Sequence, residues 1–149
     1  MKSSPATSAI GDVAHRFGLE THVLRHWEDV GLLHPERDSA GRRRYGDDDV
    51  VRVAVILRSK AAGMSLEQIQ VLLDDDHGPE RHRVLQEHLA DLDRRMEEMR
   101  VSREMTLHAF ACEAHDIARC PGFRAMVDDV LAGTRRLDLS PAGPGPFAS

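Results

Sequence analysis

The sequence has few aromatic residues, few cysteines and no long hydrophobic run. Aromatic side chains make up 4% of the 149 residues, so we expect a mostly aliphatic core and a helical fold. Two cysteines are too few for a disulfide framework, which leaves Cys112 and Cys120 with a chemical role or as structural residues. The absence of an apolar run of about 18 residues, and of a signal core after Met1, predicts a soluble, cytoplasmic protein without a membrane partner.

The charge of the chain is unevenly distributed. The formal net charge is −5, but residues 1–65 hold ten Lys and Arg against nine Asp and Glu, whereas residues 66–149 hold ten against sixteen. The excess of negative charge therefore belongs to the second half. Because an acidic chain can still carry a basic face, nucleic acid remains a possible partner of the first half.

A heptad repeat runs along residues 85–110. Its apolar or weakly polar members, spaced alternately four and three residues apart with Arg103 as the charged exception, are Leu85, Leu89, Leu92, Met96, Met99, Thr106 and Phe110. Extended back to Pro79, a helix over 79–110 would be about 48 Å long. One helix cannot bury such a seam by itself, so we predict a dimerisation helix that pairs with a second copy of the chain.

Two short helices are expected near the start of the chain. The first covers 10–17 and ends at Gly18, a residue suited to a left-handed helix terminus, and the second begins at Thr21 and stops at Gly31. Two short helices joined by a tight glycine turn make a candidate helix-turn-helix.

A hairpin is expected over residues 32–45, with a turn at 38–41. Three consecutive arginines, at 42–44, follow that turn. They could belong to a solvated surface hairpin, but beside a helix-turn-helix we interpret them as a wing that contacts phosphates. Farther along, Arg58 and Lys60 near the end of a helix over 47–62 form a candidate second phosphate-binding edge.

Four motifs, in order and spacing, resemble the MerR family of bacterial transcription regulators. They are IGDVA at 10–14, RHWEDVGLL at 25–33, Arg37 with GRRRY at 41–45, and GMSLEQI at 63–69. The resemblance implies a mainly α fold with a winged helix-turn-helix head, an antiparallel coiled-coil homodimer and a short C-terminal effector segment. It also implies promoter DNA with a long spacer between the −35 and −10 elements, which the effector-bound dimer distorts so that RNA polymerase engages both elements.

The domain boundaries follow from these elements. We predict a disordered start at 1–9, a DNA-binding domain at 10–76, a dimerisation helix at 79–110, an effector-binding loop and short helix at 111–134, and a disordered tail at 135–149.

The resemblance also implies a set of DNA-contacting side chains. These are His22, Arg25, Trp27, Arg37, Arg42, Arg43, Tyr45, Arg58 and Lys60. Trp27 stands where the family usually has tyrosine, so its indole N–H is expected to donate to a phosphate, unless Trp27 is a core aromatic. Arg25 could instead form an ion pair with Glu28 or Asp29 on its own helix.

The candidate effector ligands lie around the end of the dimerisation helix. They are His108, Cys112, His115 and Cys120, with His77 from the start of the partner's helix. The first three share one helical face if the helix continues. Two thiolates and two imidazoles suit zinc, while the thiolates alone could hold copper(I). The resemblance to copper- and zinc-sensing relatives implies the cysteine pair and assigns metal-charge selection to the position of His77, where an imidazole favours a divalent ion.

Other effector chemistries are compatible with the same residues. The cysteines could form a thiol redox switch, a small organic ligand could bind between the long helix and a helix over 122–132, or the C-terminal segment could bind another protein. A small metal hydrolase with Glu113 or Asp116 as base is a further alternative, but no additional motif supports it. We therefore predict a regulator and not an enzyme.

Overall fold

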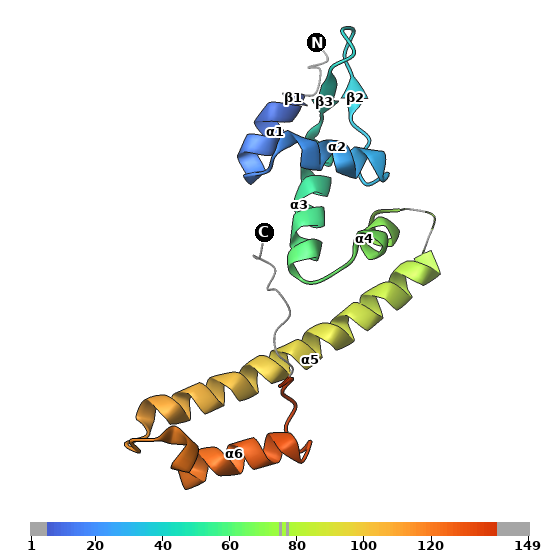
Figure 1. Cartoon of the computed structure of the whole chain (residues 1–149). Coiled ribbons are helices and arrows are strands. Elements are labelled where there is room, and N and C mark those ends of the chain that lie inside the picture. Colours follow the sequence, from blue (N-terminus) through green and yellow to red (C-terminus); the bar gives the residue numbers. More distant parts are fainter. Residues whose placement is uncertain (1–5, 75, 77, 140–149) are drawn as a thin grey trace. The chain divides into compact units, whose positions relative to one another are not determined.

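The computed structural model, drawn in Figure 1, describes residues 6–74, 76 and 78–139. The chain divides into two units, Met1–His88 and Leu89–Ser149. Its elements are β1 (Ser8–Ala9), α1 (Ile10–Phe17), α2 (Thr21–Asp29), β2 (Glu36–Arg37), β3 (Arg43–Tyr45), α3 (Asp47–Ala61), α4 (Leu66–Leu73), α5 (Gly78–Ala111), the 3-10 helix η1 (Ile117–Arg119) and α6 (Pro121–Leu131). The mainly α fold with a helix-turn-helix head is confirmed. Within the described residues, no helix is both long and apolar enough to span a bilayer.

The predicted disordered start is wrong for its last residues. Ser8 and Ala9 form β1, which pairs antiparallel with β3 in the register Ser8↔Tyr45 and Ala9↔Arg44. The Arg44 side chain adds hydrogen bonds to Thr7, 3.0 Å to Oγ1 and 2.7 Å to the carbonyl oxygen. The segment is ordered because it satisfies backbone groups along β3 that would otherwise lack partners. Residues 1–5 lie outside the described part of the chain.

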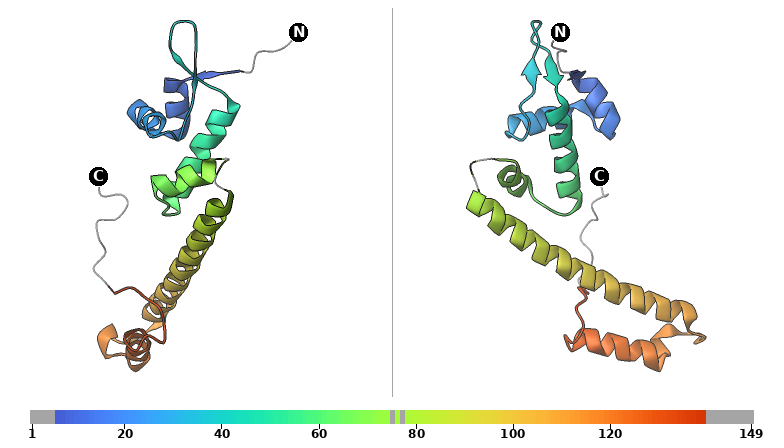
Figure 2. Two further views of the ribbon diagram at one scale, coloured as in Figure 1. Left: turned by 90° about the vertical axis from the view of Figure 1, so that its right-hand side faces the viewer. Right: turned by 180° about the vertical axis from the view of Figure 1, so that it is seen from behind.

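The hairpin of β2 and β3 completes a three-stranded sheet in the order β1-β3-β2. Its turn projects beyond α1 and α2 (Figures 1 and 2). Asp38 shapes the turn by accepting hydrogen bonds of 2.9 Å from the backbone N–H groups of Ala40 and Arg42. Gly41 has φ of 76°, a left-handed conformation that favours glycine, so the turn chemistry expected from the sequence is present.

A compact aliphatic core holds the first unit together. Its buried members come from every helix of the unit, from β3 and from the loops between them: Val13, Ala14, Leu24, Trp27, Leu32, Leu33, Tyr45, Val53, Ile56, Met64, Ile69 and Val84. The start of α4 is fixed by a reciprocal cap, in which Gln68 N–H donates to Ser65 Oγ and Ser65 N–H donates to Gln68 Oε1. This core gives the helix-turn-helix and the wing a rigid base.

The second unit is a helical hairpin. α6 folds back alongside the last turns of α5 (Figures 1 and 2). Among the described residues of this unit, only Val101, Cys120 and Val130 are buried. Arg135, assigned to the disordered tail, instead donates to Glu104 and lies 3.6 Å from Asp129, so this part of the tail prediction is wrong. Residues 140–149 lie outside the described residues.

Two stripes run along α5. The predicted seam is largely uncovered in the single chain, since Met99 is 70% exposed and Phe110 90% exposed. The opposite stripe contains Val101, which is buried, and His108, which is half-buried and contacts residues at the start of α6. α5 therefore uses one face within its own unit and leaves the heptad face uncovered.

Candidate functional site

The exposed face of α2 carries the two side chains predicted to enter or flank a DNA groove, His22 and Arg25. Arg25 has no ion pair among the described residues, so its predicted alternative pairing with Glu28 or Asp29 is not formed. Glu28 instead accepts from two arginines of the hairpin, Arg37 at 3.3 Å and Arg43 at a shorter distance. The guanidinium of Arg25 is therefore available for an external anion.

Glu28 connects α2 to both strands of the hairpin, because Arg37 belongs to β2 and Arg43 to β3. The hydrogen bond from Arg43 to Glu28 raises the pKa of Arg43, so this guanidinium stays charged at any physiological pH. Arg37 and Arg43, two of the arginines predicted to contact DNA, thus already have a carboxylate partner within the chain. We refer to Glu28, Arg37 and Arg43 as the Glu28 clamp.

The three consecutive arginines have three different surroundings. Arg42 is the exposed one and pairs with Asp38 across the turn at 3.0 Å, and its backbone N–H is the main cause of the lowered pKa of Asp38. Arg43 is half-buried in the Glu28 clamp, and Arg44 is half-buried against Thr7. The predicted basic edge at the end of α3, Arg58 and Lys60, is exposed.

Two of the predicted DNA contacts are corrected by the structure, because their side chains lie in the core. Trp27 is 2% exposed and Tyr45 is fully buried. Burial raises the pKa of Tyr45, and its hydroxyl has no hydrogen-bond partner among the described residues. In a chain with so few aromatic residues, these large side chains fill the core beneath the wing. For Trp27 the alternative of a core aromatic therefore holds.

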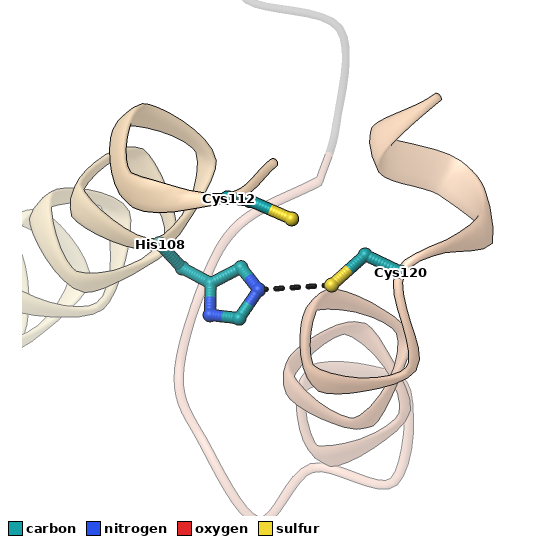
Figure 3. A group of neighbouring side chains, drawn as sticks. All are labelled: His108, Cys112 and Cys120. Atoms are coloured by element: carbon teal, nitrogen blue, oxygen red, sulfur yellow. Dashed lines mark hydrogen bonds between the residues drawn. The ribbon is translucent and has the colours of Figure 1, made fainter. Parts of the chain in front are cut away.

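A cluster of metal-ligating side chains lies at the end of α5. His108 is on the last turn of the helix, Cys112 follows its end, and Cys120 directly precedes α6 (Figure 3). One ligand atom from each residue lies within 4.8 Å of the other two, and His108 Nε2 is 3.1 Å from Cys120 Sγ. Cys120 is buried, whereas His108 and Cys112 are half-buried. We call these three residues the His/Cys cluster.

The His/Cys cluster favours a thiolate. The pKa of Cys120 is lowered to about 6, first by the hydrogen bond with His108, then by the backbone N–H of Phe123 and by the thiol of Cys112. These groups stabilise negative charge on the sulfur more than burial opposes it. Cys120 is therefore largely ionised at neutral pH, the form in which cysteine binds metals and attacks electrophiles.

Close packing fixes the His108 ring. A Cβ atom added to Gly122 would lie 2.7 Å from His108 Cε1, closer than any real side chain tolerates. The centroid of the Phe123 ring lies 6.2 Å from that of His108. Gly122 was missed by the sequence analysis, because a glycine in the first turn of a short helix carries no signal of what approaches it.

The predicted ligand set is reduced by the fold. His115 is exposed and not part of the His/Cys cluster, because α5 ends at Ala111 and the helical face that would carry His115 does not form. His77 lies outside the described residues. The cluster thus contains three of the five candidate ligands.

Comparison with known proteins identifies the family to which the chain is similar. Residues 9–76 match the profile described as MerR HTH family regulatory protein, and residues 50–108 match the one described as MerR, DNA binding. The HTH-type transcriptional regulator HmrR of Rhizobium leguminosarum bv. viciae is 33% identical over 125 residues, which are 80% of this chain and 97% of that protein. The probable heavy metal-dependent transcriptional regulator of Haemophilus influenzae is 32% identical over 118 residues, covering 74% and 92% of the two chains.

A solved structure shares the fold. The crystal structure of HiNmlR, described as a MerR family regulator lacking the sensor domain and bound to promoter DNA, covers 80% of this chain and 99% of its own, with a TM-score of 0.63 and 23% identity. The family profiles and the nearly full-length relative extend from the helix-turn-helix into α5. The chain belongs to the MerR family of DNA-binding transcription regulators.

Proposed function

We propose that this chain is a metal-responsive transcription activator, which acts as a homodimer in the cytoplasm. The observation that carries the proposal is the meeting of His108, Cys112 and Cys120 at one point. The relative named as a probable heavy metal-dependent regulator supports the same reading. All the relatives described above are regulators, which supports a regulatory role and not an enzymatic one.

The donor set fits a soft or borderline ion. Thiolates select copper(I) and zinc, and imidazole suits zinc and several other transition metals. Two donors bound at about 2.0–2.3 Å from one ion can be at most about 4.6 Å apart. The donor atoms of the His/Cys cluster lie within 4.8 Å of one another, so small side-chain rotations suffice for binding. Cys120 supplies an already ionised sulfur, which reduces competition from protons.

An ion in the His/Cys cluster would link two elements of the second unit. His108 and Cys112 lie at the end of α5, and Cys120 lies at the start of α6. The bound metal would supply the cross-link, and the chain's own residues would hold α6 against α5. We propose that this ordering of the hairpin is the change to which the regulator responds.

The proposed dimer rests on the uncovered heptad seam. Leu89, Met96, Met99 and Phe110 are exposed in the single chain, although they repeat with the period of a coiled coil. A second copy of α5 would bury them. The dimer would present two copies of a DNA-binding surface that includes His22, Arg25, Arg42, Arg58 and Lys60, together with Arg37 and Arg43 of the Glu28 clamp.

At the promoter we propose that the dimer acts by deforming DNA. In the mechanism that the family resemblance implies, a long spacer holds the −35 and −10 elements out of alignment. Bending and untwisting the spacer would let RNA polymerase contact both elements. Contacts from the exposed cations to phosphates would position the protein and anchor the deformed DNA.

The metal content of the protein tests the proposal. Tag-free protein purified without oxygen is analysed by mass spectrometry, titrated with zinc and copper(I), and its promoter activity is measured in vitro. We expect about one ion per protomer, with Cys112→Ser losing both the ion and the response while it still binds DNA. His115→Ala, an exposed histidine outside the His/Cys cluster, is the control and should retain both. A Cys112→Ser variant that still responds to metal would refute the proposed site.

A thiol redox switch is a second candidate function. The sulfurs of Cys112 and Cys120 lie within 4.8 Å of each other, and the pKa of Cys120 is lowered to about 6. Loss of two electrons and two protons to an oxidant such as hydrogen peroxide would join them in a disulfide. A count of free thiols separates the candidates, because the redox switch predicts loss of both thiols together with the change in promoter activity.

A further inference from the structure

We infer that Glu28 is a positioning residue for DNA binding, which orients the guanidinium of Arg43 toward a phosphate although its own charge repels DNA. The inference rests on the proposed contact of Arg43 with a phosphate, and it gives an acidic side chain a part in recognition. Three observations carry it: which nitrogen of Arg43 is bound, how Glu28 is held, and how the clamp is packed.

The hydrogen bond to Glu28 uses only one end of the Arg43 guanidinium. Arg43 Nε donates to Glu28 Oε2, and within the described residues its two Nη groups form no hydrogen bond. A guanidinium carries its N–H donors in a rigid plane, so a fixed Nε also fixes the direction of both Nη groups. The edge formed by Nη1 and Nη2 is left for a phosphate, which accepts paired hydrogen bonds from arginine.

A second arginine holds the Glu28 carboxylate from the other strand of the hairpin. Arg37 Nη2 lies 3.3 Å from Glu28 Oε1, so each carboxylate oxygen has its own guanidinium partner. Arg37 Nη1 also donates to the carbonyl oxygen of Gly41 in the turn, at 3.0 Å. Glu28 therefore cannot rotate away from Arg43 without also losing its contact with Arg37.

The packing around the Glu28 clamp limits its movement. The side chains of Glu28 and Arg43 are 21% and 24% exposed, and Tyr45, two residues farther on the same face of β3, is fully buried. Burial and then the charge of Glu28 raise the pKa of Tyr45, while the charge of Arg43 lowers it, so the clamp lies close to this buried ring. Arg43 is thus ordered before DNA arrives, and binding need not order it.

The charge of Glu28 makes two roles predict opposite effects. A carboxylate near a phosphate repels it, and a carboxylate that merely neutralises the wing competes with DNA for the arginines. In either case, removal of the charge would tighten DNA binding. A positioning role predicts weaker binding, because the DNA itself would then have to order Arg43. The direction of the change therefore distinguishes the roles.

The test measures promoter binding of the full-length protein by fluorescence anisotropy at fixed salt. Glu28→Gln replaces the charged acceptor by a weaker neutral one, and we expect promoter affinity to fall by about fivefold, the size of the effect of ordering one side chain on binding. Asp29→Asn is the matched control, because it removes the same charge from the next, exposed residue of α2. It should leave affinity within about twofold of the wild type or tighten binding slightly.

A double-mutant cycle separates positioning from a general loosening of the wing. In an Arg43→Ala background, Glu28→Gln should weaken promoter binding no further, because the side chain that it orients is absent. Arg43→Lys leaves Glu28 unaltered and keeps the positive charge, but lysine has no rigid plane that a carboxylate could direct. This variant should therefore bind the promoter more weakly than the wild type.

Each outcome decides for or against the inference. Tighter binding in Glu28→Gln would overturn it and make Glu28 a competitor of DNA. An equal loss in the wild-type and Arg43→Ala backgrounds, or wild-type affinity in Arg43→Lys, would overturn it as well. Unchanged affinity in Arg43→Ala would remove the proposed phosphate contact itself. A weakened Arg43→Ala beside an unchanged Glu28→Gln would leave that contact standing and reject only the positioning role.

Discussion

The two units of this protein differ in how completely each buries its own apolar side chains. The first unit has a core of twelve buried residues drawn from its helices, from β3 and from loops. In the described part of the second unit, only Val101, Cys120 and Val130 are buried, while Met96, Met99 and Phe110 stand exposed on α5. The first unit therefore has the contacts of a self-sufficient domain, and the second has those of an element that needs a partner.

The same comparison separates two kinds of polar interaction. In the first unit, the Glu28 clamp holds the wing against α2, and Asp38 fixes the turn of the wing. Along α5, ion pairs such as Arg94 with Glu98 and Arg100 with Glu104 are local and exposed, and they support the helix without defining a tertiary contact. We therefore expect the first unit to present its DNA-binding residues rigidly. We expect the hairpin of α5 and α6 to depend on a bound effector for its order.

The largest effect is expected in the core of the first unit. Ile56→Ala removes a fully buried side chain of α3 and should lower the free energy of unfolding by about 2–5 kcal/mol. Val51→Ala, an exposed position on the same helix, is the matched control and should change it by less than about 0.5 kcal/mol. Chemical denaturation followed by circular dichroism measures both. Similar losses in the two variants would mean that the first unit is not organised around this core.

The next effect concerns the uncovered seam. Met99→Glu places a charge at an exposed position of the single chain, so α5 should keep its helix, but the proposed dimer should weaken by about 100-fold or more. Analytical ultracentrifugation measures the dissociation constant. Ala90→Glu introduces the same charge off the seam and should leave the dimer intact. A Met99→Glu protein that dimerises like the wild type would remove the heptad face from the interface.

A smaller effect is expected at the wing. Arg43→Ala removes a cation assigned to a phosphate, so it should weaken promoter binding by about tenfold and lower the salt dependence by about one phosphate contact. The effect is modest because Arg43 already pairs with Glu28. Fluorescence anisotropy over a range of salt concentrations measures both quantities. Glu28→Gln tests the clamp separately, because it frees both arginines without removing a cation. Unchanged binding in Arg43→Ala would contradict the wing assignment.

The smallest effect is expected where the chain leaves α6. Arg135→Ala breaks ion pairs with Glu104 and Asp129 that are partly exposed, and such pairs contribute about 1 kcal/mol or less. Hydrogen exchange in α6 should speed up modestly, whereas exchange in α3 should not change. Val101→Ala is the stronger companion variant, because it removes a buried contact of the same hairpin. Equal exchange rates in wild type and Arg135→Ala would show that these ion pairs do not hold the hairpin.

Much of the first unit could be predicted from local sequence signals. The glycine after 10–17 and the turn at 38–41 act over a few residues, so the first helices and the hairpin were expected in the right places. Which side chains are exposed and able to contact DNA was less predictable. Trp27 and Tyr45 carry polar atoms suited to a phosphate, but their rings are buried, and burial depends on residues far away in the sequence.

The candidate site shows the same limit. Spacing along one helix selected His108 and Cys112, because residues four apart share a face. It selected His115 as well, on the condition that the helix continues past its predicted end at residue 110, but α5 ends at Ala111. The contact of Cys120 with His108 joins residues twelve positions apart in the sequence, and the close approach of Gly122 to His108 depends on how α6 folds back.

The sequence by itself determined the family, the helical fold and the heptad face, because those depend on periodicity and on motifs that operate along the chain. The tertiary structure decided which arginines are paired, which aromatic residues are buried and which of the candidate ligands meet. These outcomes depend on contacts between elements, such as Glu28 with Arg43 and His108 with Cys120, whose energies are set by three-dimensional proximity and burial.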